Sequence, residues 1–242
     1  MDLHGSVALV TGGAQRLGRA IALALGRAGA NVAIHYHSSA DQARAVVDQL
    51  TGMGVEAASF QGDLAVVAEV ERVVDQAVAR WGRLNLLVNN AGIWGSTPIG
   101  TVTQERWDEL IATNTRSAFF AAQRAAPALR EAHGVIVNIA DVGALRPWRN
   151  HTPYLVSKGA VVTLTEALAK DLAPEVRVNA IAPGPVLLPD DWTPKQAEGA
   201  AKTVLLRRIG SPDDIAQAVI YLAQAEYVTG VVLPVDGGNR LM

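Results

Sequence analysis

A tyrosine, a lysine and an aspartate have residue types and a spacing that could carry proton transfer. Tyr154 and Lys158 are four residues apart, so on a helix they share one face about one turn apart. An ammonium beside a phenol favours tyrosinate and lowers the pKa of the phenol, which makes it a better acid or base near neutrality. Asp141 comes thirteen residues before Tyr154. Because Tyr-x-x-x-Lys alone is a common spacing, it indicates a reaction only together with a second motif.

A glycine-rich turn near the start of the chain supplies that second motif. Residues 11–18 read TGGAQRLG, after an apolar run at 7–10 and before apolar residues at helical spacing over 19–25. A buried strand, a glycine turn and a helix in this order begin a dinucleotide-binding sheet, where the backbone approaches a pyrophosphate and the helix N-terminus offers N–H groups. The alternative is an ordinary strand-to-helix connection. Arg16 stands where such a turn often has a second glycine, which brings a cation beside the phosphates.

Strand and helix patterns alternate along the rest of the chain without a linker. Apolar and alternating runs predict further strands over 31–37, 55–61, 84–89, 134–139, 176–181 and, at an edge, 231–235. Helical spacing predicts helices over 40–51, 66–81, 103–130 (interrupted near Asn114, and kinked or shortened at Pro127), 154–172 and, after the N-cap Ser211, 212–224. The repeated units predict an α/β fold over residues 1–242: a single-domain, Rossmann-type, doubly wound parallel sheet of about seven strands.

Composition and charge exclude several classes of protein. Half of the 242 residues are apolar, enough for a sizeable core, and a net charge of −2 creates no global field that favours nucleic acid or an anionic membrane. The absence of cysteine excludes disulfides and thiolate chemistry. The first residues lack the features of a signal peptide, and no uncharged apolar run reaches membrane-spanning length. We therefore expect a cytoplasmic protein that acts on a small molecule.

The end of the second predicted strand favours NADP over NAD. NAD-binding sheets usually carry an acidic residue there, but this chain has no carboxylate before Asp41. Hydroxyls and imidazoles nearby, together with Arg16, can instead hold a 2′-phosphate. The candidate residues are His35, Tyr36, His37, Ser38 and Ser39. His35 and His37 lie on one strand face, but no third ligand is evident, so we expect no metal site.

Four ordered motifs resemble the short-chain dehydrogenase/reductase family over nearly the whole chain. They are the glycine turn at 11–18, Asn89-Asn90-Ala91-Gly92, Tyr154-Leu155-Val156-Ser157-Lys158 and Pro183-Gly184. The chain departs from the usual pattern at Arg16 and at Asp141, where the catalytic serine of the family falls. These departures, with residues 35–40 and 187–191, resemble the pteridine reductases. The resemblance implies an NADPH-dependent reductase of pterin or folate rings, commonly a homotetramer.

The resemblance also implies roles for individual residues. Lys158 should hydrogen-bond the nicotinamide ribose, and Asn114 should carry a water that links Lys158 to solvent. Asp63 should accept a hydrogen bond from the adenine amine. Trp94 should either stack a planar heterocycle against the nicotinamide or pack at the rim under the substrate loop. Residues 187–192 should form a flap that excludes water, and Trp148, Arg149 and His151 should line the pocket mouth.

The implied site therefore has three overlapping sets of residues. The catalytic set is Asp141, Tyr154, Lys158 and Asn114. The cofactor set is Gly12, Arg16, Leu17, Gly18, His35, Tyr36, His37, Ser38, Ser39, Asp63, Leu64, Asn90, Ala91, Gly92, Tyr154, Lys158, Pro183 and Gly184. The substrate set is Arg16, Trp94, Asp141, Tyr154, Leu187 and Leu188.

The residue at position 141 separates the candidate substrates. A serine there would donate a hydrogen bond to a ketone oxygen, whereas an ionised aspartate cannot donate and opposes tyrosinate formation at Tyr154. Asp141 suits the reaction if it is protonated part of the time, or if the substrate presents N–H groups, as pterins do. One alternative is a carbonyl or 3-oxoacyl thioester reductase of the same family. The other is a non-catalytic NADP-binding sensor in which Asp141 only caps a loop.

Overall fold

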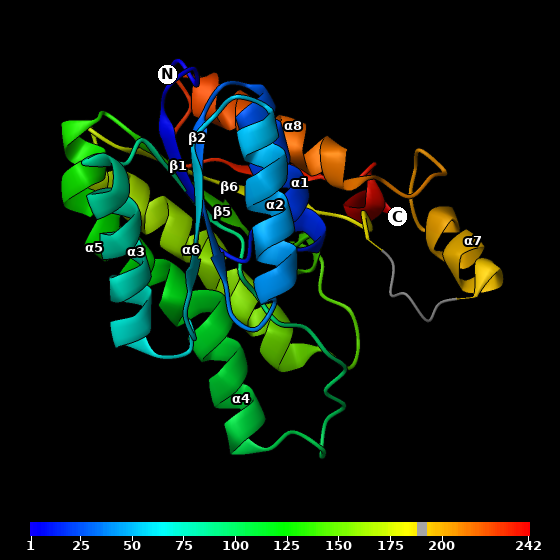
Figure 1. Ribbon diagram of the computed structural model, residues 1–242. Helices are drawn as coiled ribbons and strands as arrows, with labels where there is room; N and C mark the ends of the chain where they lie inside the picture. Colours follow the sequence, from blue (N-terminus) through cyan, green and yellow to red (C-terminus); the bar gives the residue numbers. More distant parts are fainter. Residues whose placement is uncertain (188–192) are drawn as a thin grey trace.

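A parallel sheet forms the centre of the computed structural model, which describes residues 1–187 and 193–242 (Figure 1). Seven strands lie in the order β3-β2-β1-β4-β5-β6-β7, and every pairing is parallel. They are β1 (Val7–Val10), β2 (Asn31–Tyr36), β3 (Ala57–Gln61), β4 (Leu86–Asn89), β5 (Val135–Ile139), β6 (Arg177–Pro183) and β7 (Val232–Val235). The predicted doubly wound sheet of about seven strands is confirmed, with β7 at an edge.

Helices cover both faces of the sheet, as its apolar strands require (Figure 1). One buried cluster joins the sheet to α1 (Arg16–Arg27), α2 (Ala40–Gly52) and α8 (Pro212–Gln224). A second cluster, on the opposite face, joins it to α3 (Val67–Trp81), α5 (Ser117–Glu131) and α6 (Thr152–Leu172). Ser211 caps α8 as predicted, since its side chain accepts a hydrogen bond from the Asp214 N–H.

The long helical region predicted over 103–130 consists of three pieces. α4 (Gln104–Ile111) leads into a π-helical turn (Ala112–Arg116), and this turn leads into α5. The interruption therefore falls at Asn114, where the sequence predicts it. Pro127 lies inside α5, which continues to Glu131, so the predicted shortening at the proline does not occur.

The helix α7 (Pro194–Lys202) was not predicted. Its N-terminus carries a capping box, in which Thr193 and Gln196 satisfy each other's backbone N–H groups, and Pro194 occupies the first turn. That pattern is visible in the sequence and could have predicted the helix. In the described part of the chain, no helix is long and apolar enough to cross a membrane.

The sheet order places the binding edge between β1 and β4. From β1 the chain winds outward to β2 and β3, then returns to β4 and winds the other way to β7. The carboxyl ends of β1 and β4 therefore border the crevice in which sheets of this type bind their ligands. The motif residues that follow β1, β4, β5 and β6 meet at this edge.

Candidate active site

The glycine turn after β1 brings the N-terminus of α1 close to the sheet. A Cβ atom on Gly18 would lie 2.0 Å from the carbonyl oxygen of Gly12, so only glycine permits this approach. No side chain among the described residues caps the first turn of α1. Its N–H groups therefore point to a binding site for an anionic group, such as the pyrophosphate expected here.

Arg16 begins α1 in a backbone conformation that usually selects glycine. Its φ angle is +48°, in the left-handed region. Its side chain is exposed beside the half-buried Leu17. This geometry explains why many turns of this kind have glycine at this position, and it keeps a guanidinium at the mouth of the crevice.

The His35 ring is hydrogen-bonded to the backbone of the glycine turn, which corrects the expectation that its imidazole contacts a 2′-phosphate. Its ring is buried at 3% exposure. Nδ1 accepts a hydrogen bond from the Gly12 N–H (3.1 Å), and Nε2 donates to the Gly62 carbonyl oxygen (2.9 Å). Burial lowers the pKa of His35. A neutral ring with both nitrogens engaged positions the turn and has no atom left for a phosphate.

The segment after β2 keeps the other residues predicted for the 2′-phosphate at the surface. His37 and Ser38 are exposed, while Tyr36 and Ser39 are half-buried. The amide of Gln15 donates to the Ser39 hydroxyl oxygen (2.7 Å), which ties this segment to the glycine turn. The first carboxylate beyond it belongs to Asp41, which is exposed and pairs with Arg44 (3.7 Å). The arrangement therefore fits a phosphate better than a ribose hydroxyl.

Thr11 and Asn90 connect the ends of β1 and β4. The Thr11 hydroxyl oxygen accepts hydrogen bonds from the Asn90 and Ala91 N–H groups, both at 3.0 Å. The Asn90 amide donates to the carbonyl oxygens of Thr11 (2.9 Å) and Gly12 (3.2 Å). Asn90 therefore fixes the shape of the crevice wall.

The remaining predicted cofactor contacts lie at strand ends on the same edge. After β3, an Asp63 carboxylate oxygen accepts from the Ala65 N–H (2.9 Å), and Leu64 is buried. Pro183 ends β6, and the Gly184 N–H donates to the Val235 carbonyl oxygen of β7 (3.0 Å). Asp63, Leu64, Pro183 and Gly184 thus lie at or just after the carboxyl ends of their strands.

The phenol of Tyr154 and the carboxyl group of Asp141 form a hydrogen-bonded pair. Tyr154 lies in the first turn of α6, and Asp141 follows β5. The Tyr154 hydroxyl donates to Asp141 Oδ2 (2.6 Å), while the Gly143 N–H donates to Asp141 Oδ1 (2.7 Å). Sequence reasoning missed Gly143, although the Asp-x-Gly spacing typical of a helix cap could have indicated it.

The surroundings of this pair raise the pKa of both groups. Burial raises the pKa of Asp141, against the opposing effects of its hydrogen bonds and of the nearby Lys158 and His151. Burial, and then the Asp141 carboxylate, raise the pKa of Tyr154 above its ordinary value of 10.0. The expected lowering of the phenol pKa by Lys158 is therefore wrong for this arrangement, because the neighbouring carboxylate and the loss of water dominate.

Lys158 and Asn114 lie behind Tyr154. The Lys158 ammonium donates to the Ile139 carbonyl oxygen (2.8 Å), and burial lowers its pKa to about 8. The Asn114 amide in the π-helical turn donates to Ser157 Oγ (2.9 Å) and to the Ile93 carbonyl oxygen (3.0 Å). The turn thus links the segment after β4 to α6. Whether Asn114 also carries a water stays a prediction.

Two of the predicted substrate residues, Trp94 and Leu187, are exposed. Trp94 is 57% exposed, and its indole lies 5.3 Å from the His151 imidazole, which precedes α6. Leu187 is exposed at 36%, and Leu188 lies outside the described residues, as does the rest of the predicted flap. The indole is therefore at the mouth of the site.

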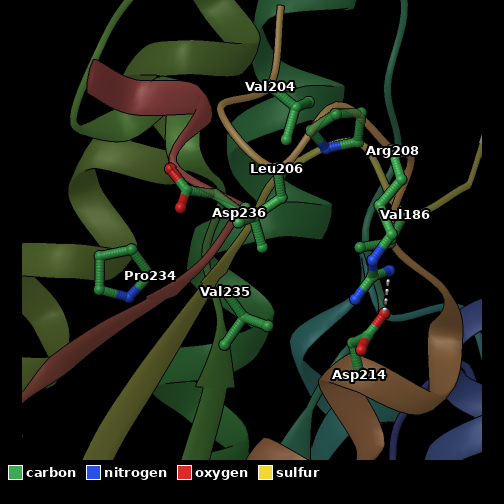
Figure 2. Close-up of a pocket in the computed structure, with 12 residues that line it drawn as sticks. Val186, Val204, Leu206, Arg208, Asp214, Pro234, Val235 and Asp236 are labelled. Atoms are coloured by element: carbon green, nitrogen blue, oxygen red, sulfur yellow. Dashed lines mark hydrogen bonds and ion pairs between the residues drawn. The ribbon is translucent and has the colours of Figure 1, made fainter. Parts of the chain in front are cut away.

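A cavity of about 260 Å³ lies beyond Gly184, between the end of β7 and the segment before α8 (Figure 2). Val186 and Arg208 line one side, and Pro234, Val235 and Asp236 line the other; Arg208 pairs with Asp214 (3.4 Å). Gly184 of the predicted cofactor set is one of the residues that line it, whereas none of the described lining residues belongs to the predicted catalytic set.

Comparison with known proteins places this geometry in a family. The family model described as Enoyl-(Acyl carrier protein) reductase matches residues 12–240. The chain is 35% identical to the 3-oxoacyl-[acyl-carrier-protein] reductase FabG of Staphylococcus aureus over 96% of both chains. A short-chain dehydrogenase/reductase from Serratia marcescens superimposes with a TM-score of 0.94, at 37% identity, over 99% of this chain and 100% of that one. The chain belongs to the short-chain dehydrogenase/reductase family.

Two further relatives show how wide the family likeness is. Versicolorin reductase stcU of Emericella nidulans is 36% identical over 98% of this chain and 96% of its own. A blue fluorescent protein from a metagenomic library, solved in complex with NADPH, has a TM-score of 0.93 at 35% identity over 99% of both chains. This short-chain dehydrogenase/reductase is therefore an oxidoreductase, and the predicted family is confirmed. The pteridine reductase branch stays a prediction.

Proposed function

We propose that this enzyme reduces a C=N bond in a pterin, dihydropterin or dihydrofolate ring with NADPH. The observation that carries the proposal is the buried hydrogen bond of 2.6 Å between Tyr154 and Asp141 at the end of β5. A protonated carboxyl group and a neutral phenol can both donate to a ring nitrogen, and an ionised carboxylate can accept from a ring N–H. A pterin presents both kinds of group, whereas a simple ketone presents only an acceptor.

The cofactor proposal rests on the glycine turn and on the segment after β2. The N-terminus of α1 and Arg16 would hold the phosphates, and the exposed His37 and Ser38 would contact the 2′-phosphate. Lys158, at 3.4 Å from a Cβ placed on Gly92, would contact the nicotinamide ribose. The solved relative in complex with NADPH supports the same choice. NADPH supplies the hydride when it is bound.

The chain itself supplies the proton and the orientation of the ring. In the proposed reaction the Tyr154 hydroxyl turns from Asp141 Oδ2, to which it donates at 2.6 Å in the free chain, and donates its proton to the ring nitrogen of the bond being reduced. The protonated carboxyl of Asp141 then donates a proton to the phenolate oxygen that forms. Trp94 covers the exposed face of the ring and excludes water. Lys158 keeps a positive charge near the phenolate that forms.

A 3-oxoacyl thioester reductase is the second candidate. It is supported by the likeness to FabG, whose name states that reaction. Against it, Asp141 replaces the hydroxyl that would donate to a ketone oxygen. A sensor without turnover is a weaker reading for a member of this family in which the phenol and the lysine both occupy the site.

A substrate panel tests the proposal. NADPH oxidation is followed at saturating cofactor with 7,8-dihydrobiopterin, 7,8-dihydrofolate and an acetoacetyl thioester. We expect the highest kcat/KM with one of the two nitrogen rings. A higher kcat/KM with the thioester would favour the second candidate, and tight NADPH binding without turnover of any substrate would favour the sensor.

We also propose a homotetramer in the cytoplasm, as the resemblance implies. The exposed apolar side chains of Trp107 in α4 and Phe119 in α5 are consistent with a covered helix face. Size-exclusion chromatography with light scattering measures the mass directly. A mass near 25.5 kDa, that of one chain, would contradict the tetramer.

A further inference from the structure

His151 has one ring nitrogen that lacks a partner. Its Nδ1 lies 2.8 Å from the Arg149 carbonyl oxygen, which can only accept, so Nδ1 carries a hydrogen. In the neutral ring Nε2 is then an acceptor. This atom is shielded from solvent and has no hydrogen-bond partner among the described residues. Buried polar atoms without a partner are rare, and each one needs an explanation.

The buried His35 shows what a purely structural imidazole looks like in this site. His35 engages both ring nitrogens with backbone groups, Nδ1 with Gly12 and Nε2 with Gly62. Its hydrogen bonds account for its position completely. His151 does not follow this pattern, which indicates that its Nε2 is held for a group that the described residues do not supply.

Two indoles flank the His151 ring. The Trp94 ring lies 5.3 Å away at 41°, and the Trp148 ring lies 6.1 Å away at 65°. Both indoles are exposed, at 57% and 39%. His151 therefore lies in a partly open aromatic surface, one helical turn outward from Tyr154.

The backbone around this surface is fixed in place. The Asn150 carbonyl oxygen accepts from the Thr97 N–H (2.6 Å), which ties the segment of Trp94 to the segment of His151. Asn150 itself adopts a φ of +65°, a left-handed conformation that asparagine tolerates better than most other residues. A Cβ on Gly143 would lie 2.3 Å from the Trp148 ring, so this indole packs directly on the loop that holds Asp141. The two walls are thus prearranged beside the reacting groups.

We propose that His151 is a specificity-determining residue whose Nε2 accepts a hydrogen bond from an O–H or N–H group on the substituent of the substrate. This substituent extends from the reacting ring toward solvent, between the indoles of Trp94 and Trp148. The proposal rests on the proposed function for the identity of the ring. On a dihydropterin the donor is a hydroxyl of the side chain at carbon 6, and on dihydrofolate it is the amine N–H that bridges to the benzoyl group.

The test pairs variants of His151 with two substrates that differ in the donor. His151→Phe keeps a ring between the indoles and removes the acceptor, whereas His151→Gln offers an amide oxygen near the position of Nε2. With NADPH, the substrates are 7,8-dihydrobiopterin, which has side-chain hydroxyls, and 6-methyl-7,8-dihydropterin, which has none. We expect His151→Phe to raise KM for dihydrobiopterin about three- to tenfold, with little change in kcat. KM for the methyl compound should not change, and His151→Gln should restore part of the difference.

Several outcomes would overturn the inference. Equal changes of KM for the two pterins, or no change for either, would show that Nε2 recognises no substituent. A lower kcat for both pterins, with an unchanged ratio of the KM values for the two pterins, would assign His151 a structural role. Thermal unfolding and the Kd for NADPH, measured for each variant, identify a folding defect. If His151→Phe has such a defect, the KM values of His151→Gln for the two pterins test the inference instead.

A failure of the proposed function is distinguishable from a failure at His151. If the wild type reduces no pterin, the same variants are compared on acetoacetyl-N-acetylcysteamine, which has an amide N–H, and on ethyl acetoacetate, which has none. A selective rise of KM for the thioester in His151→Phe would support the role of His151 while the pterin proposal fails. Equal effects on both ketones, or no turnover of any of the four compounds, would overturn both.

Discussion

At the scale of single residues, the site is defined by which group lies next to the Tyr154 phenol. The spacing of Tyr154 and Lys158 predicts that the ammonium sets the pKa of the phenol. In the structure, however, the Tyr154 hydroxyl donates a hydrogen bond to Asp141 (2.6 Å), and the Lys158 ammonium donates to the Ile139 carbonyl oxygen. Burial and the carboxylate then keep the phenol protonated. Tyr154 is therefore held in its neutral form, the form that still carries a proton.

The pH dependence of turnover should follow Asp141. Its pKa is raised above the ordinary value of 3.8, first of all by burial, and only its protonated form can return a proton to Tyr154. The rate constant kcat for the pterin reaction should therefore fall as pH rises through this raised pKa. Steady-state kcat measured over the whole pH range in which the enzyme stays folded tests this effect, and a kcat that nowhere falls with rising pH would remove Asp141 as the donor.

The buried charge of Lys158 should lower the free energy of unfolding. A pKa lowered from 10.5 to about 8 in a fully buried ammonium corresponds to roughly 3 kcal/mol at pH 7, an upper estimate. Lys158→Met should raise the free energy of unfolding by about 1–3 kcal/mol at pH 7 and abolish turnover. The cost of the charge is present below the folded pKa and disappears above the unfolded one, so the gain should shrink toward pH 10. Urea unfolding at both pH values measures it, and a less stable variant at pH 7 would contradict the assignment.

Arg16 combines a strained backbone conformation with a positive charge beside the cofactor site. Because its φ is +48°, Arg16→Gly should raise the free energy of unfolding by about 1 kcal/mol while weakening NADPH binding. Arg16→Lys is the matched control, since it keeps the strain and the charge and should match the wild type in stability. Thermal unfolding and calorimetric Kd values separate the two effects. Unchanged NADPH affinity in Arg16→Gly would remove the guanidinium from the cofactor site.

At the scale of elements, the turn after β5 and the start of α6 act as one unit. Gly143 donates its N–H to Asp141, and any Cβ there would meet the Trp148 ring at 2.3 Å. Gly143→Ala should therefore displace both Asp141 and Trp148, with a loss of about 1–3 kcal/mol in stability and a lower kcat/KM.

Gly159→Ala is the matched control for this prediction. Gly159 lies inside α6, and a Cβ there would meet nothing within 4 Å. The alanine should stabilise the helix by about 0.5–1 kcal/mol without a loss of activity. Equal destabilisation by the two substitutions would contradict the packing argument for Trp148.

The elements show which features a sequence can reveal. Apolar periodicity predicted the seven strands, and Asn114 marked the break between α4 and α5, because both signals are local. The position of His35 under the glycine turn could not be predicted, since alternation fixes the face of a strand but not the backbone groups that it meets. The Tyr154–Asp141 hydrogen bond likewise depends on how α6 packs against β5.

At the scale of the whole molecule, the fold identifies the family but does not identify the substrate. TM-scores of 0.93 and 0.94 at 35–37% identity show that the sheet and its helices are shared with relatives of different names. The sheet brings the glycine turn, the end of β4 and the Tyr154–Asp141 pair to one edge. Under the proposed function, the choice of substrate depends on few side chains, above all on Asp141, which cannot donate a hydrogen bond as a hydroxyl does when it is ionised.

Replacing that carboxyl group by a hydroxyl tests the account most directly. The measurement is kcat/KM of the wild type and of Asp141→Ser, with NADPH, on 7,8-dihydrobiopterin and on an acetoacetyl thioester. We predict that Asp141→Ser loses most of its activity on the pterin and keeps or gains activity on the thioester. A variant that reduces the pterin as well as the wild type does would contradict the central role of the Asp141 carboxyl group.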